Sequence, residues 1–168
     1  LNMVQGAGET GRVLVENADI DGVFFVGSFA TGQKIHQHFG GKPEKIVALE
    51  MGGNNPLLVF DVKDKLAAAY LIVQSAFMTA GQRCTCVRRL IVPDTEEGDA
   101  LIKQLTELVA KIKVGKYSDT PEPFMGPVIS AEAAQQVLQA QQKLQQQGGQ
   151  RVLAMKLLEE KTGLLSPG

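Results

Sequence analysis

The amino-acid sequence predicts an α/β fold, and three observations carry that prediction. Short apolar runs rich in β-branched, aliphatic and aromatic residues alternate with longer stretches whose apolar residues recur every three or four positions. Glycine-containing turns separate most of these segments. The chain has 168 residues, 44% hydrophobic and 21% charged, as expected for about one globular domain that can bury a core. Strands that alternate with helices are typical of α/β proteins.

The first sixty residues are expected to form four strands and two helices. The strands are short apolar runs at residues 1–5, 22–26, 45–49 and 56–60. The helices are expected at residues 11–17 and 31–39. The run at 22–26 is apolar throughout, which favours a strand buried on both faces, as in a parallel sheet. Gly40 and Gly41 follow the second helix as a C-cap pair would.

The remaining residues predict three longer helices and two strands. The helices are expected at residues 64–80, 97–113 and 131–147, and the strands at 89–92 and 152–155. The first of these helices is apolar on several faces, which predicts a buried helix. Ser130 is placed to cap the last one, whose many glutamines are expected to form a solvated face.

The charge balance excludes several classes of function. Lys and Arg number 17, Asp and Glu 18, and the net charge of −1 provides no basic surface for a nucleic acid. No run reaches the roughly 18 apolar residues of a membrane span, and residues at the start of the chain lack a basic region followed by a hydrophobic one. We therefore expect a cytoplasmic protein without a nucleic-acid or membrane partner. A start at Leu1 and a stop just after an apolar pair indicate a segment of a longer protein.

Two glycine-rich turns are candidates for phosphate binding. Residues 6–11, which include Gly8, have the glycine spacing of a dinucleotide fingerprint, but the carboxylate required roughly twenty residues later is absent, so a plain tight turn remains the alternative. Gly27, Ser28 and Gly32 are better placed, because they follow a buried strand and open a helix. Free amides and the helix dipole there would suit a diphosphate, and Ser28 could add a hydroxyl donor.

Glu50 is a lone carboxylate between two apolar strands, followed by Gly52 and Gly53. If partly buried, its pKa would rise toward the range of a general base. The alternative is a carboxylate at a strand end that faces water.

Cys84 and Cys86 are the cysteines of the chain, too close for an unstrained disulfide and expected as reduced thiols. Cys84 follows a buried helix and a glycine, a setting in which a thiolate can be activated, with Arg83 as an adjacent cation. Cys86 would face the same way in an extended segment, and we interpret it as a core residue.

His36 and His38 could join the two cysteines in a zinc site, but both the spacing of one residue and the different faces of a helix argue against it. Both histidines are expected to be solvated. A hydrolase that uses Cys84 with one of these histidines as base is a further alternative.

Three motifs, taken in order, resemble the aldehyde dehydrogenase superfamily. Residues 25–28 with Gly32 resemble its cofactor loop, residues 49–56 its glutamate signature, and residues 81–85 its cysteine signature. Glu50 and Cys84 are 34 residues apart, in the order and at the interval of that family. Residues 124–130 also resemble a family segment. Val26 and Asn54 depart from the usual threonine and lysine, which affects neither the nucleophile nor the base.

The resemblance implies a middle fragment of the aldehyde dehydrogenase fold. Residues 1–49 would end a Rossmann-like NAD(P)-binding domain, and residues 50–168 would begin the catalytic domain. Cys84 would be the nucleophile and Glu50 the base for thioester hydrolysis, with NAD, or alternatively NADP, held at Gly8, Gly27, Ser28 and Gly32. No metal is implied. The full-length protein is expected to be a homo-oligomer.

Within the family, Met51, the Asn54-Asn55-Pro56 variant and residues 81–90 most resemble members that act in arginine catabolism, which implies succinylglutamate semialdehyde as the small-molecule substrate. The alternative is that this polypeptide by itself is a non-catalytic α/β fragment, because the resemblance leaves other binding residues outside the chain.

Overall fold

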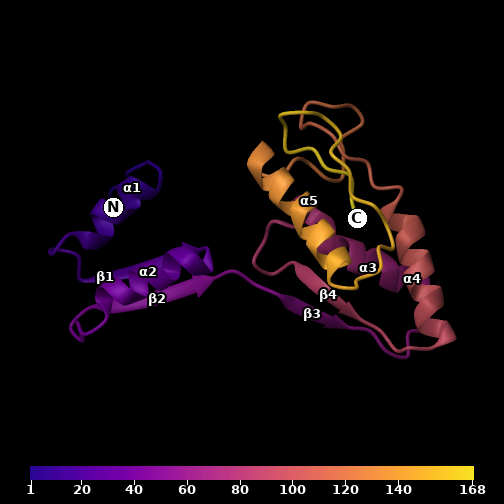
Figure 1. Cartoon of the computed structure of the whole chain (residues 1–168), viewed down its shortest axis with the longest axis horizontal. Helices are drawn as coiled ribbons and strands as arrows, with labels where there is room; N and C mark the ends of the chain where they lie inside the picture. The colour runs from indigo at the N-terminus through magenta and orange to yellow at the C-terminus, as the bar shows by residue number, and fades with distance from the viewer. The chain divides into compact units, whose positions relative to one another are not determined.

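The computed structural model describes all 168 residues, which divide into two compact units, Leu1–Gly53 and Asn54–Gly168. Figure 1 traces the chain and labels its helices and strands. Both units combine parallel strands with helices, which confirms the predicted α/β class. None of the helices is both long enough and apolar enough to cross a bilayer.

The first unit is built on a strand–helix–strand unit with parallel strands (Figure 1). Its elements are α1 (Gly8–Glu16), β1 (Gly22–Gly27), α2 (Phe29–Phe39) and β2 (Ile46–Met51). Helix α2 buries Gly32, Ile35 and Phe39, and it packs on both strands. The parallel register pairs Val26 with Glu50 and Gly27 with Met51, so the carboxyl ends of β1 and β2 lie at one edge.

Three expectations for the first unit need correction. Residues 1–5 form no strand, and the helix that follows begins at Gly8 rather than at residue 11. Strand β1 is not buried on both faces, since Phe24 is 83% exposed and Val26 77% exposed. Helix α2 packs on β1 and β2 and covers one face of the strand. The apolar side chains on the other face of β1 meet no second layer within this unit.

The second unit contains a second parallel pair with helices packed on it (Figure 1). Its elements are β3 (Asn55–Leu58), α3 (Lys65–Phe77), the 3₁₀ helix η1 (Met78–Gly81), β4 (Val87–Ile91), α4 (Glu96–Val109) and α5 (Ala131–Gln146). Ala69, Ile72 and Leu101 form the centre of the core, against which Leu57 of β3 and Leu90 of β4 pack. The core therefore joins α3 and α4 to the strand pair.

Helix starts in both units follow the capping rules. Ser28, Asp64, Thr95 and Ser130 precede α2, α3, α4 and α5, and each side chain accepts a hydrogen bond from the amide three residues later. Such a cap satisfies one of the amides that a helix leaves without a partner. The four capped helices begin within two residues of the starts expected from the sequence, whereas α1, which has no side-chain cap, begins three residues earlier than expected.

Two expectations for the second unit are wrong. Helix α3 is buried along one side, but Leu66, Tyr70 and Leu71 are more than half exposed. Residues 152–155 form no strand, because the Gln141 side chain binds both the amide and the carbonyl of Met155. A glutamine expected on a solvated face thus provides the hydrogen bonds that a strand partner would provide.

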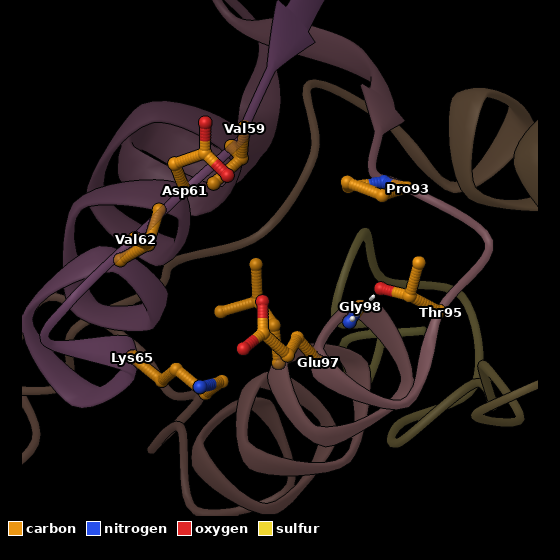
Figure 2. A pocket seen from close by; sticks show the side chains of 9 residues that line it. Val59, Asp61, Val62, Lys65, Pro93, Thr95, Glu97 and Gly98 are labelled. Atoms are coloured by element: carbon orange, nitrogen blue, oxygen red, sulfur yellow. Dashed lines mark hydrogen bonds between the residues drawn. The ribbon is translucent and has the colours of Figure 1, made fainter.

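A pocket of about 120 Å³ lies beyond the carboxyl ends of β3 and β4 (Figure 2). Val59, Asp61 and Lys65 line one side, and Pro93, Thr95 and Gly98 line the other. Gly98 is buried and its amide donates to Thr95 Oγ1. A Cβ added at Gly98 would come within 2.0 Å of the Pro93 carbonyl oxygen, so only glycine allows α4 to approach this backbone.

We predict that Gly98→Ala destabilises the chain by about 2–3 kcal/mol, because a clash with backbone cannot be relieved by a side-chain rotation. Chemical denaturation of the two chains would measure the difference. Gly11→Ala is the matched control, since Gly11 is also helical and a Cβ there meets nothing within 4 Å. Better helix propensity should leave that variant neutral or more stable by up to about 1 kcal/mol. Equal stability of Gly98→Ala and the parent chain would contradict the packing argument.

Candidate active site

The turn between β1 and α2 has the geometry of an anion site. Ser28 caps α2 by accepting from the Thr31 amide at 3.2 Å. The first-turn amides of Phe29 and Ala30 have no partner within a helix, and they carry the positive end of the helix dipole. The Ser28 hydroxyl, expected as an extra donor to a ligand, instead donates to Thr31 Oγ1 at 2.9 Å. Backbone amides are therefore the donors that this turn offers to a diphosphate.

Gly32 lies where α2 packs closely on the end of β2. It is buried, and a Cβ at this position would come within 2.1 Å of the Met51 sulfur. Met51 follows Glu50 directly, so the close approach of α2 at Gly32 helps to fix the end of the strand that carries the carboxylate.

Glu50 lies on β2 next to Val26 of β1, and its side chain is exposed. Gly52, with φ of +62°, turns the chain away from the sheet, while its amide donates to the Gly27 carbonyl at 3.1 Å. The carboxylate therefore lies at the same sheet edge as the turn that contains Gly27 and Ser28. Of the two interpretations of Glu50, a strand-end carboxylate that faces water is the one seen within this unit.

Gly8 opens α1, a helix that buries none of its residues. The next residue, Glu9, forms an ion pair with Arg12, and this guanidinium lowers the pKa of the Glu9 carboxyl. An ionised carboxylate in the first turn of α1 opposes the binding of another anion there. The strand expected before this turn is also missing, so the β1–α2 turn is the better candidate for a diphosphate.

Cys84 lies in a turn in the second unit, between η1 and β4. Thr79, Ala80 and Gly81 all have positive φ, which ends the helical path of α3 and leads the chain into this turn. The Cys86 amide closes the turn on the Arg83 carbonyl at 3.1 Å. The Cys84 side chain is exposed, whereas Cys86 is 3% exposed with its sulfur 3.9 Å from the Met78 carbonyl oxygen.

The expectation that both cysteines face the same way is wrong, because the segment is a turn rather than a strand. The interpretation of Cys86 as a core residue is confirmed. The Arg83 guanidinium, expected beside the thiol, donates instead to Thr79 Oγ1 at 3.1 Å.

Three side chains hold residues 81–86, which we call the cysteine turn. Asn55 donates to the carbonyls of Cys84 and Cys86, and Arg88 donates to the carbonyls of Gly81 and Arg83. Gln82 accepts from the Ile129 amide at 2.8 Å and donates to the Pro127 carbonyl at 3.3 Å. The segment at 124–130 thus supports the cysteine turn directly. Sequence reasoning missed Asn55 and Arg88, because neither residue type signals that its side chain returns to a neighbouring turn.

The histidines belong to the first unit. His36 of α2 is exposed, and His38 is half-buried with its ring nitrogen 3.2 Å from Lys42 Nζ. The two cysteines belong to the second unit. No group of three or more His, Cys, Asp or Glu side chains is gathered as a metal ion would require.

The predicted site residues thus fall into three groups. Gly27, Ser28, Gly32 and Glu50 meet at one edge of the β1–β2 pair. Gly8 lies on α1, and Cys84 lies in the second unit. None of them lines the pocket of Figure 2.

A family model and the sequences of curated relatives both match this chain to aldehyde dehydrogenases. The model of the aldehyde dehydrogenase family matches residues 1–166. N-succinylglutamate 5-semialdehyde dehydrogenase of Hahella chejuensis is 54% identical over all 168 residues, and that of Ectopseudomonas mendocina is 52% identical. The chain covers 34% of each, so it spans about a third of the length of these relatives.

Solved structures give the same fold. A 1-pyrroline-5-carboxylate dehydrogenase variant from Thermus thermophilus matches 96% of the chain with a TM-score of 0.84 and 30% identity. The NADP-dependent glyceraldehyde-3-phosphate dehydrogenase of Bacillus halodurans, solved with NADP, matches 98% with a TM-score of 0.79 and 33% identity. The chain covers 31% and 33% of these proteins. The predicted fold is thereby confirmed.

Proposed function

Because this chain belongs to the aldehyde dehydrogenase family, we propose that the complete protein oxidises an aldehyde to a carboxylate with NAD(P)⁺ through a thioester on Cys84. The observation that carries the proposal is the contrast between the two cysteines. Cys84 is exposed on a turn held by three side chains, whereas Cys86 is buried beneath it. An accessible thiol in a fixed backbone is what a covalent nucleophile needs.

The residues at the β1–α2 turn fit the diphosphate of a nicotinamide cofactor. The first-turn amides of α2 have no partner within the helix, and Gly32 packs closely against Met51 at the end of β2. When bound, the cofactor supplies an acceptor for the hydride that leaves the substrate carbon.

In the first half of the reaction the Cys84 thiolate attacks the aldehyde carbon, forming a C–S bond and an alkoxide. The Cys84 amide has no acceptor within the chain, so it is free to donate to this alkoxide. Loss of hydride from the same carbon leaves a thioester on Cys84.

In the second half Glu50 accepts a proton from a water molecule, whose oxygen attacks the thioester carbonyl. The C–S bond breaks, the carboxylate leaves, and the sulfur departs as a thiolate. The proposal for Glu50 rests on the family motif at residues 49–56, and the exposed carboxylate can reach water. The Cys84 sulfur serves both halves of the reaction, because it is a soft nucleophile in the first and a good leaving group in the second.

We propose succinylglutamate semialdehyde as the substrate, in line with the names of the 52–54% identical relatives. The full-length protein should show a kcat/KM at least about 100-fold higher for this compound than for propanal, because a site built for carboxylates leaves polar groups unpaired when they are missing. NADH formation with each aldehyde measures the ratio. Similar values for the two aldehydes would refute this substrate and leave the oxidation chemistry in place.

A further inference from the structure

The carbonyls of the cysteine turn are occupied to an unusual degree by side-chain donors. Four of its six carbonyls, those of Gly81, Arg83, Cys84 and Cys86, accept from Asn55 or Arg88. Asn55 alone reaches the carbonyl of Cys84 itself. Its Nδ2 lies 2.6 Å from the Cys84 oxygen and 3.0 Å from the Cys86 oxygen.

The strand register places Asn55 where it can make both bonds. Asn55 is the first residue of β3 and pairs with Val87, but the next pair is Pro56 with Arg89, so Arg88 has no partner in the ladder. A bulge of this kind re-aims side chains at the end of a strand. Arg88, the residue left over, binds the cysteine turn, and the guanidinium of Arg89 donates to the Asn54 carbonyl.

The chemistry of the asparagine amide matches the two acceptors. Nδ2 carries two hydrogens, and each can be donated to one carbonyl. A carboxylate of the same shape has none to donate and would meet two carbonyl oxygens with negative charge. Asn55 holds the peptide plane that follows Cys84, and Arg88 holds the plane that precedes it through the Arg83 carbonyl, so together they set the direction in which the side chain leaves the backbone.

We propose that Asn55 is a positioning residue for the Cys84 thiol. This inference rests on the proposed role of Cys84 as nucleophile. Asn55 holds the Cys84 carbonyl toward the strand pair, while the thiol stays exposed and the Cys84 amide stays free. A misplacement of a reacting atom by about 1 Å can cost around 100-fold in rate.

The test is the rate of the pre-steady-state NADH burst in the full-length protein at saturating aldehyde and NAD⁺. Asn55→Asp should slow the burst by about 100-fold and leave the KM for NAD⁺ within about twofold. Asn55→Ser keeps a hydroxyl donor and should lie between the parent and Asn55→Asp. The matched control is Asn54→Asp, which adds the same charge one residue earlier at an exposed side chain without a hydrogen bond, and it should keep the parent burst rate.

A burst rate in Asn55→Asp within twofold of the parent would overturn the proposal, as would an equal slowing by Asn54→Asp. If Asn55→Asp does not fold, Asn55→Ala removes the same donor without a charge, and the same two criteria apply. Cys84→Ala, measured in the same experiment, distinguishes failure of the proposed function from failure of the proposed role of Asn55. If that variant still oxidises the aldehyde, the proposed function fails and the Asn55 proposal with it. If it is inactive while Asn55→Asp is normal, the Asn55 proposal alone fails.

Discussion

Replacement of Cys84 by alanine in the full-length protein is expected to abolish both NADH formation and release of the carboxylate product. In the proposed mechanism hydride leaves the carbon that carries both the alkoxide and the bond to sulfur, and hydrolysis acts on the thioester that results, so neither half proceeds without the thiol. We expect a loss of at least about 10⁴-fold in kcat. Steady-state NADH formation measures the loss, and intact mass under turnover should show no acyl adduct.

Cys86→Ala is the matched control, because it removes the same atom two residues later. Cys86 is buried, so its truncation should lower the melting temperature through a small cavity, yet leave the NADH burst close to that of the parent. An active Cys84→Ala variant, or a Cys86→Ala variant that folds but forms no adduct, would contradict the assignment of the nucleophile.

Most elements of this fold could be predicted from the sequence, because they depend on local chemistry. Ser28 and Ser130 cap helices through bonds that span three residues. Gly41, Gly52 and Gly148 end elements in backbone conformations with positive φ. Such signals involve a few neighbouring residues and do not depend on tertiary contacts.

Burial could not be predicted in the same way. Phe24 and Leu71 are apolar, but whether they are covered depends on a second layer that hydrophobic periodicity does not identify. The strand expected at 152–155 is absent for a related reason. The Met155 amide donates to the side chain of Gln141, 14 residues earlier, and not to a neighbouring strand.

The candidate site shows the same division. Cys84 and Glu50 could be proposed from the sequence because their motifs are local, whereas the contrast in exposure between Cys84 and Cys86 depends on the turn that follows η1. Asn55 was missed although it stands within a motif, because its partners are 29 and 31 residues away and depend on the register of β3 against β4. Positions that act through tertiary contacts carry no signal in one sequence.

Glu50→Gln is expected to separate the two halves of the reaction. If Glu50 acts on the hydrolytic water, the first half should survive, and mixing with aldehyde and NAD⁺ should give a burst of about one NADH per active site. Glutamine keeps the size of the side chain but cannot accept the proton of water, so turnover should then fall by about 10²–10⁴-fold. Intact mass should show the acyl group retained on Cys84.

The control is Glu44→Gln, which removes the same charge from another exposed residue of the first unit and should behave like the parent. A Glu50→Gln variant with neither burst nor adduct would place Glu50 earlier in the reaction, as the base that deprotonates Cys84. The pH dependence of Cys84 alkylation would then differ between the variant and the parent. A burst followed by a stalled thioester, with unchanged alkylation, is the outcome that assigns Glu50 to hydrolysis alone.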